Sequence, residues 1–254
     1  MSFSIQPNNS NGYASIYEYN GSVWSKLGND IVGVMANDQC GRAVSLSGNG
    51  NIVAIGSPYA NNTDPNAPNG SGHVRIYEYI SGSWSQLGQN IDGEAAGDFS
   101  GWSVSLSNDG HTVAIGAPYN DGNNKTNCGQ IRIYHWDGSA WNQVGQDIDG
   151  EWSDDYAGYD QTVSLSGNGN MVAIGAPRND GNGTDAGHVR IYEYNGNSWA
   201  QVSEIGGEAA NDYSGMSVSL NSDGSRVAIG SWGQQSGRVD VYEYASGSWT
   251  QLGS

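Results

Sequence analysis

The chain has 254 residues, and nine Lys and Arg stand against 26 Asp and Glu, giving a formal net charge of −17. The sequence therefore lacks the basic footprint of a nucleic-acid binder and is not attracted to anionic lipid headgroups. No apolar run approaches the roughly 18 residues of a membrane span, so we expect no membrane insertion. Abundant Gly (39 residues) beside 15 Tyr and nine Trp is typical of short strands joined by tight turns. The sequence predicts an all-β protein.

The predicted strands recur along the chain as two half-motifs. The first places two strands, A and B, around a Gly turn, as in SVSLSNDGHTVAIGAP, and occurs at 43–58, 103–118, 162–177 and 217–232. The second places strands C and D around a Trp-containing hairpin, as in GHVRIYEYISGSWSQLG, and occurs at 12–28, 72–88, 129–151, 187–203 and 237–253. Four-stranded antiparallel units repeated every ~50 to 60 residues predict the blades of a β-propeller.

The repeats predict a single domain over residues 1–254 with five blades. Their approximate bounds are 2–33, 34–93, 94–150, 151–207 and 208–254. The first blade is expected to have three strands, with residues 3–7 as its strand B and no strand A. Bulky side chains on both faces of each sheet need a neighbouring blade on both sides, so we predict that the five blades close into a ring. A piece of a longer propeller is the alternative.

The sequence GDFSGWSVSLS followed by VAIGAP resembles the FG-GAP repeat, which builds the propeller of integrin α-subunits. The nearer likeness is to the Trp-rich variant of bacterial and environmental sequences, and it extends over nearly the whole chain. The resemblance implies recognition or adhesion in an extracellular or surface-exposed setting, without catalysis. Members often bind calcium between strands A and B. Here those connections (SGNGN, SNDGH, SGNGN and NSDGS) are too short and too poor in carboxylates to supply six to eight oxygens, so we expect no metal and no cofactor.

Polar residues that recur once per blade are interpreted as structural. Four aspartates precede strand A and are expected to cap their turn: Asp38, Asp98, Asp155 and Asp212. Three arginines of strand C are expected to pair with an acid of the neighbouring blade: Arg75, Arg132 and Arg190. No GxSxG elbow or comparable signature is present, so no catalytic residue is assigned and we predict that the protein is not an enzyme. Whether Cys40 and Cys128 pair is left open.

Candidate binding residues break the repeat. They lie in the loops between strands B and C (57–71, 117–128, 176–186 and 231–236), which are expected on one rim, or are non-repeating tryptophans. The set comprises Asn120, Asp121, Asn179, Asp180, Trp102, Trp152 and Trp232. Loop amides and carboxylates beside aromatic rings are typical of surfaces that bind a protein or a glycan, and exposed Trp is suited to sugar stacking.

Three functions agree with these observations. The first is a non-enzymatic binding or adhesion module that presents variable loops on a rigid propeller. The second is a structural component of a virus particle or surface layer, and the third is a multivalent lectin. The N-terminal MSFSIQPNNSNG has no secretory signal, so a leader has been removed or the protein reaches an extracellular, cell-surface or virion location without one. Assembly into a homo-oligomer is compatible with each function.

Overall fold

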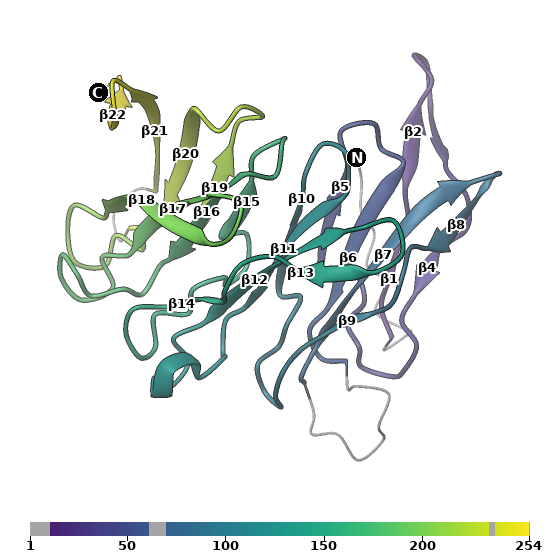
Figure 1. The fold of residues 1–254 in the computed structure, drawn as a ribbon, viewed down its shortest axis with the longest axis horizontal. Helices are drawn as coiled ribbons and strands as arrows, with labels where there is room; N and C mark the ends of the chain where they lie inside the picture. Colours follow the sequence, from purple (N-terminus) through teal and green to yellow (C-terminus); the bar gives the residue numbers. More distant parts are fainter. Residues whose placement is uncertain (1–10, 61–69, 234–236, 254) are drawn as a thin grey trace.

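Antiparallel sheets follow one another along the chain, each made from one repeat unit (Figure 1). The computed structural model describes residues 11–60, 70–233 and 237–253. In this part of the chain the regular structure is β-strand apart from one short 3-10 turn, η1 (Gly122–Asn124). Within the same ranges no helix has the length and apolarity needed to cross a membrane. The predicted all-β class is confirmed.

Four blades contain the four predicted strands in the order A, B, C, D. Blade 2 consists of β5 (Ala43–Leu46), β6 (Ile52–Ser57), β7 (His73–Ile80) and β8 (Ser83–Gln86), with β9 (Ile91–Asp92) also paired to β7. Blade 3 consists of β10 (Ser103–Leu106), β11 (Thr112–Ala117), β12 (Gln130–Trp136) and β13 (Trp141–Gln143), with β14 (Ile148–Asp149) also paired to β12. Blade 4 consists of β15 (Val163–Leu165), β16 (Met171–Ala176), β17 (His188–Tyr194) and β18 (Trp199–Gly206). Blade 5 consists of β19 (Ser217–Leu220), β20 (Arg226–Ser231), β21 (Arg238–Ala245) and β22 (Ser248–Leu252).

Blade 1 is thinner than the others. Strand C is represented by β1 (Tyr13–Ala14) and β2 (Tyr17–Tyr19), and strand D by β3 (Trp24–Lys26) and β4 (Ile31–Val32). The strand β1 pairs with β4, and β2 pairs with β3. The strand B predicted at residues 3–7 lies outside the described residues.

The turns between strands A and B are closed by their own side chains. In blade 3, Asp109 Oδ1 accepts hydrogen bonds from Ser107 Oγ at 2.6 Å and from the backbone N–H of His111 at 2.9 Å. Asn49, Asn168 and Asp223 accept equivalent backbone bonds in the other complete blades. These carbonyl and carboxylate oxygens therefore serve the turn, as short Asx-type turns require.

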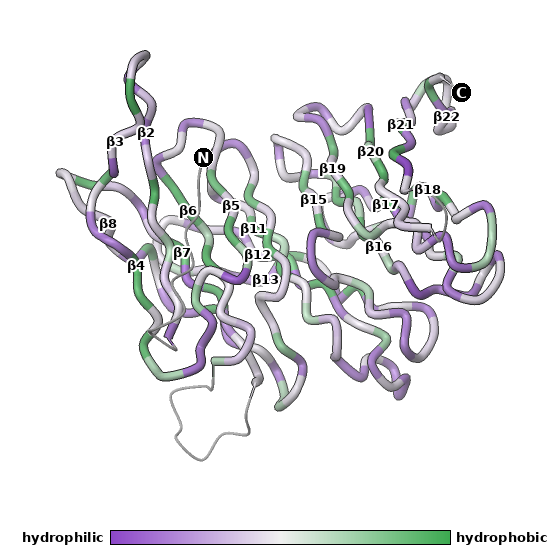
Figure 2. Tube along the Cα trace, turned by 180° about the vertical axis from the view of Figure 1, so that it is seen from behind, coloured by the Kyte–Doolittle hydropathy of each residue, from purple (hydrophilic) through white to green (hydrophobic). Residues whose placement is uncertain are grey.

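Hydrophobic cores lie between blades rather than inside them. Figure 2 shows the hydrophobic residues, in green, along the strands of the blades. Four clusters of buried side chains occupy the four junctions from blade 1 to blade 5. At the junction of blades 2 and 3, for example, Ile76 packs in one cluster with Ile115 and Trp141. Burial on both faces explains why strands B and C are rich in Val and Ile throughout.

A repeated indole hydrogen bond joins blade 1 to blade 2, blade 2 to blade 3 and blade 3 to blade 4, whereas the indole N–H of Trp249 in blade 5 has no partner among the described residues. The Trp of strand D donates its Nε1–H to a backbone carbonyl of the preceding blade. The three bonds are Trp84 to Leu27 at 2.8 Å, Trp141 to Leu87 at 2.9 Å and Trp199 to Val144 at 2.9 Å. Each of these three rings is buried, so the Trp stabilises the junction both by its buried apolar area and by the hydrogen bond of its N–H.

The strand C arginines also reach the preceding blade. Arg132 Nη2 donates to the Asp92 carbonyl at 2.8 Å, and its Nη1 lies 3.7 Å from Glu94 Oε1. Arg190 repeats this arrangement with Asp149 and Glu151. The predicted pairing with a neighbouring acid is confirmed for these two residues.

Arg75 contacts a different set of groups in blade 1 and blade 2. Its Nη2 donates to the Val32 carbonyl at 3.0 Å and lies 3.5 Å from Cys40 Sγ. Cys40 and Cys128 are both buried and free, so the disulfide that the sequence left open is not formed. Burial raises the pKa of both thiols.

The predicted closed ring is wrong for the described residues, which form an open arc. Blades 1 and 5 lie at opposite ends of the long axis in Figure 1, and within residues 11–60, 70–233 and 237–253 no strand of one pairs with a strand of the other. Their outer faces are open to solvent, with Trp24 56% and Val239 69% exposed.

The indole bond can be tested with Trp141→Phe. We expect a loss of about 1–3 kcal/mol in the free energy of unfolding, because the Leu87 carbonyl is left buried without its donor. Trp249→Phe is the matched control, since its indole N–H is buried without a hydrogen-bond partner among the described residues. Urea denaturation measures both, and equal losses would contradict the assigned role of the bond.

Burial of His73 makes stability depend on pH. Burial, with a smaller effect of the Arg75 charge, lowers the pKa of His73 to about 4, below its ordinary value of 6.5. Between these two values the unfolded chain binds a proton that the folded chain does not, so stability falls as the pH falls. From pH 7 to pH 5 we expect the wild type to lose about 2 kcal/mol more than His73→Gln in urea denaturation. Parallel losses in the two proteins would refute this assignment.

Candidate functional site

One rim of the arc is formed where each strand B ends and the next strand A begins. An Asp shapes the turn before each strand A. Asp98 Oδ2 accepts the Ala95 N–H at 3.0 Å, and Asp155 Oδ2 accepts the Trp152 N–H at 2.9 Å. Asp38 and Asp212 accept equivalent bonds. The predicted capping role of all four aspartates is confirmed.

The residue after each of these aspartates adopts a left-handed backbone. Gln39, Phe99, Tyr156 and Tyr213 have φ values of 51°, 54°, 53° and 50°. A non-Gly residue in this region costs on the order of 1–3 kcal/mol and often marks a functional site. Here the conformation recurs in every blade whatever the side chain, so it belongs to the turn. Three of the four positions carry an aromatic ring.

Two of these rings, Phe99 and Tyr156, belong to a continuous aromatic cluster across blades 2, 3 and 4. Trp102 stacks on Tyr159 with ring centres 5.5 Å apart, and Tyr119 packs edge-on against both Phe99 and Tyr156 at 5.2 Å. Two guanidinium groups extend the cluster by cation–π contacts: Arg42 over Trp102 at 5.0 Å and Arg178 over Tyr156 at 5.1 Å. Arg42 is also bonded to Asp160 across the rim, with Nη1 and Oδ1 3.0 Å apart.

The cluster borders a pocket of about 260 Å³ between blades 3, 4 and 5. Its wall is mainly aromatic, and its lining consists of Tyr119, Tyr156, Tyr159, Pro177, Arg178, Tyr213, Met216 and Trp232. Trp232 is 70% exposed and Arg178 is the charged group of the wall. Burial raises the pKa of the Tyr119, Tyr156 and Tyr213 phenols, which therefore stay protonated. Tyr156 and Tyr213 donate their protons to Asp154 and Asp185, which leaves their oxygens as acceptors.

The three candidate tryptophans lie in three different environments. Trp232 lines the pocket, as described above. Trp102 is buried beneath the rim in the aromatic cluster and is not open to a ligand. Trp152 is 62% exposed and lines a second, shallower hollow of about 370 Å³ together with Asp180.

The candidate loop residues serve mainly to hold their own loops. Asn120 and Asn179, predicted as binding residues, are buried, and their amides donate to Asp98 and Asp155 at 3.0 Å. The physical reason is that a buried carboxylate needs a second donor. Asp121 and Asp180 each accept a backbone N–H of their own loop at 2.8 Å, from Asn127 and Asp185. Their loops, 117–128 and 176–186, are described, whereas 61–69 and 234–236 lie outside the described residues.

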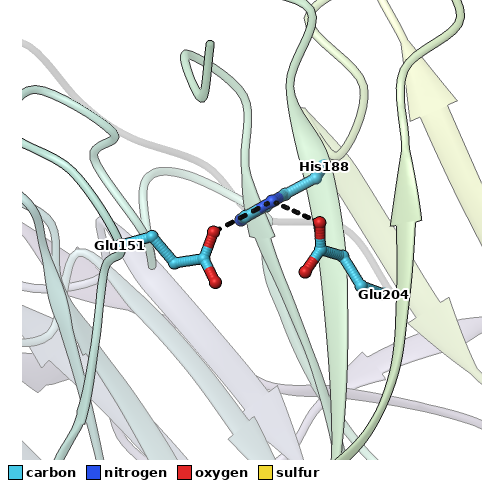
Figure 3. Close-up of side chains that lie close together, drawn as sticks. All are labelled: Glu151, His188 and Glu204. Carbon is cyan, nitrogen blue, oxygen red and sulfur yellow. Dashed lines mark ion pairs between the residues drawn. The ribbon is translucent and has the colours of Figure 1, made fainter. Parts of the chain in front are cut away.

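A separate group of titratable side chains lies at the junction of blades 3 and 4 (Figure 3). His188 begins β17 and is 2% exposed, and its Nδ1 lies 4.0 Å from Glu151 Oε2 and 3.7 Å from Glu204 Oε1. Burial, with a smaller effect of the Arg190 charge, lowers the pKa of His188 to about 3. The ring is therefore neutral at neutral pH, and these three residues are the group that could hold a metal ion.

The fold and the aromatic rim define a propeller-type repeat protein whose recurring polar residues build turns and junctions. Residues 92–134, which carry the GDFSGWSVSLS and VAIGAP sequences, match the model of the FG-GAP repeat. This match confirms the resemblance drawn from the sequence. A comparison with curated protein sequences finds no match.

Several solved structures share the fold over nearly the whole chain. A protein of Bacteroides uniformis described as a putative 6-phosphogluconolactonase has a TM-score of 0.61 at 10% identity, covering 97% of this chain and 68% of that one. A functionally unknown protein of Desulfotomaculum acetoxidans has a TM-score of 0.59 at 12% identity, covering 98% and 68%. A protein of Lactobacillus plantarum has a TM-score of 0.59 at 12% identity, covering 99% and 65%. At such identities the likeness concerns the fold alone, and this chain spans about two thirds of their length.

Sequence reasoning missed most of the pocket. Tyr119 and Arg178 follow the IGAP of strand B, and Tyr156 and Tyr213 follow the capping Asp, so all four occupy repeat positions. Such positions were interpreted as structural because they recur. One feature of the sequence could have indicated the pocket: Arg178 stands at a repeat position that is Tyr in blades 2 and 3.

The structural role of Asn179 can be separated from a binding role. We expect Asn179→Ala to lower the free energy of unfolding by about 1–3 kcal/mol, because the buried Asp155 loses a donor. The exposed Asn197 is the control, and Asn197→Ala is expected to change stability by less than about 0.5 kcal/mol. Urea denaturation measures both. An unchanged stability in Asn179→Ala would return this residue to the set of ligand contacts.

Proposed function

We propose that the protein is a non-enzymatic binding module that recognises neutral carbohydrate in the aromatic pocket on its rim. The observation that carries the proposal is the pocket itself, a concave site of about 260 Å³ walled by four Tyr and one exposed Trp. Concave sites with aromatic walls and a few placed polar groups are typical of small-molecule binding. The FG-GAP propeller fold, a scaffold for binding or interaction, supports the same class.

The chemistry of the wall favours a sugar. Trp232 offers an exposed ring face to the C–H groups of a pyranose, and neighbouring phenols supply hydrogen bonds to its hydroxyls. Tyr213 is placed for this by a bond from its OH to Asp185 Oδ2 at 3.2 Å. Arg178 adds further donors to the wall. We therefore expect a ligand that has one apolar ring face and several hydroxyl groups around the ring.

The charge of the chain argues against an anionic ligand. A net charge of −17 raises the energy of bringing a negative group to the surface, and one lining guanidinium offsets little of it. The same charge argues against a 6-phosphogluconolactonase activity, which the name of the Bacteroides uniformis protein suggests, because its substrate is a phosphorylated sugar lactone. The described residues that line the pocket include no Ser, Cys, His or carboxylate to act as nucleophile or base.

The test is a titration with neutral oligosaccharides of glucose, mannose and N-acetylglucosamine, followed by tryptophan fluorescence and calorimetry. We expect one of these sugars to bind and Trp232→Ala to weaken its affinity by about 10-fold or more, as is usual for a Trp at the centre of a contact. Trp24→Ala is the matched control, because Trp24 is 56% exposed but lies in blade 1, at the far end of the arc.

The outcomes distinguish the readings. Equal weakening by both variants, or no binding of any of these sugars, would overturn the carbohydrate proposal. Loss of binding in Trp152→Ala alone would move the site to the second hollow. Hydrolysis of 6-phosphogluconolactone above the rate in buffer would overturn the non-enzymatic part.

A further inference from the structure

We propose that Glu151, His188 and Glu204 bind a divalent ion of the zinc class, which clips blade 3 to blade 4. The site is independent of the aromatic pocket and of the A–B turns where FG-GAP proteins often carry calcium. Glu151 follows β14 of blade 3, whereas His188 and Glu204 lie on β17 and β18 of blade 4. An ion held by all three would therefore bridge two sheets.

The three donors converge on one point from three sides. Figure 3 shows one carboxylate oxygen of each Glu directed at the His188 ring. The Nδ1–oxygen distances of 4.0 and 3.7 Å are too long for hydrogen bonds, and the chosen donor atoms all lie within 4.8 Å of one another. Donors bound to one zinc at about 2.0–2.2 Å lie somewhat over 3 Å apart, so small side-chain movements complete the site.

Each carboxylate is already oriented by a second contact. The other oxygen of Glu151 lies 3.8 Å from Arg190 Nη1, and the other oxygen of Glu204 accepts from Gln201 Nε2 at 3.4 Å. Arg190 is fixed in turn by its bond to the Asp149 carbonyl. Outer contacts of this kind orient metal ligands and are part of a built metal site.

The buried imidazole is the observation that points to a ligand. The His188 side chain is 3% exposed, and its Nδ1 faces the two carboxylates at distances beyond hydrogen-bond range. A neutral ring keeps a lone pair for coordination. The side chains of Glu151 and Glu204 are 35% and 46% exposed, so an ion can enter from solvent and keep water on its open side.

Among the described residues the cluster occurs once, although its parts recur. In blade 2, His73 occupies the position of His188, and Glu94, which follows β9, occupies the position of Glu151. Blade 4 is one residue shorter than blade 3 after the strand D Trp. Glu151 lies ten positions after Trp141, whereas the corresponding Glu208 lies nine positions after Trp199. In blade 4 the shortened segment forms one continuous strand, β18, which places Glu204 beside β17 opposite Arg190.

The donor set selects the class of ion. Imidazole nitrogen is a poor ligand for calcium and magnesium, which prefer oxygen alone, and suits zinc and its neighbours among the transition metals. Two carboxylates with one His leave coordination positions for water, as in open zinc sites. The two negative charges outweigh the nearby Arg190, so the local field favours a dication.

The experiment is a calorimetric titration of the folded protein with Zn²⁺, repeated with Co²⁺ to read coordination from its visible absorption. We expect one equivalent to bind and to raise the melting temperature with ion concentration. Glu204→Gln and His188→Gln should each weaken binding by more than about 100-fold, since even outer contacts are worth about 10- to 100-fold. Gln201→Ala should weaken it by about 10-fold.

The controls separate this site from adventitious binding. His73→Gln removes the equivalent His of blade 2 and should bind Zn²⁺ as the wild type does. His111→Gln removes the exposed imidazole that lies 3.8 Å from Asp109, and it too should leave the tight site intact. Unchanged affinity in Glu204→Gln, which alters a half-exposed side chain, would overturn the proposal. So would loss of the tight site in either control, or a wild type that binds no ion.

Discussion

The hydrogen bond from the strand D indole of blades 2, 3 and 4 to a carbonyl of the preceding blade is the constraint on which these three junctions depend. It orients the large buried ring of each junction, around which the Val and Ile of strands B and C pack. It also explains the ends of the arc. Trp24 has no preceding blade in the described chain and is exposed, so the same residue type is core in blades 2 to 4 and surface in blade 1. A solenoid-like series of nearest-neighbour interfaces behaves in this way.

The aromatic pocket is built from residues of the repeat rather than from an insertion. The left-handed turn that precedes strand A carries Gln39 in blade 2 and aromatic rings in the later blades, with the same backbone. Replacing the side chain at such a position changes the rim without disturbing the sheet below. The pocket arises where Tyr156 and Tyr213 of these turns meet Arg178 and Trp232, which follow strand B and replace a Tyr and a Pro of other blades. Side-chain changes at repeat positions thus give a regular scaffold a surface that differs from blade to blade.

The two candidate sites share their supporting blades. Blade 3 supplies Tyr119 and blade 4 supplies Tyr156 and Tyr159 to the wall of the pocket. The Glu151 and His188 pair joins the same two blades. A contact that fixes one blade against the other also fixes the relative placement of these rings. Preorganisation of this kind lowers the entropy cost of binding a ligand.

The sequence by itself determined the all-β class, the four-stranded blades, the capping aspartates and the arginine pairing, because each depends on local turn chemistry and on a spacing repeated many times. Only the tertiary structure decided the rest. Whether five blades close depends on how the first and last blades are placed in space, which no local pattern encodes. Asn179 is buried because Asp155, from the preceding turn, needs its amide. The aromatic pocket and the group around His188 bring together residues of two or three blades, and side chains that recur in sequence become a site only where the sheets place them side by side.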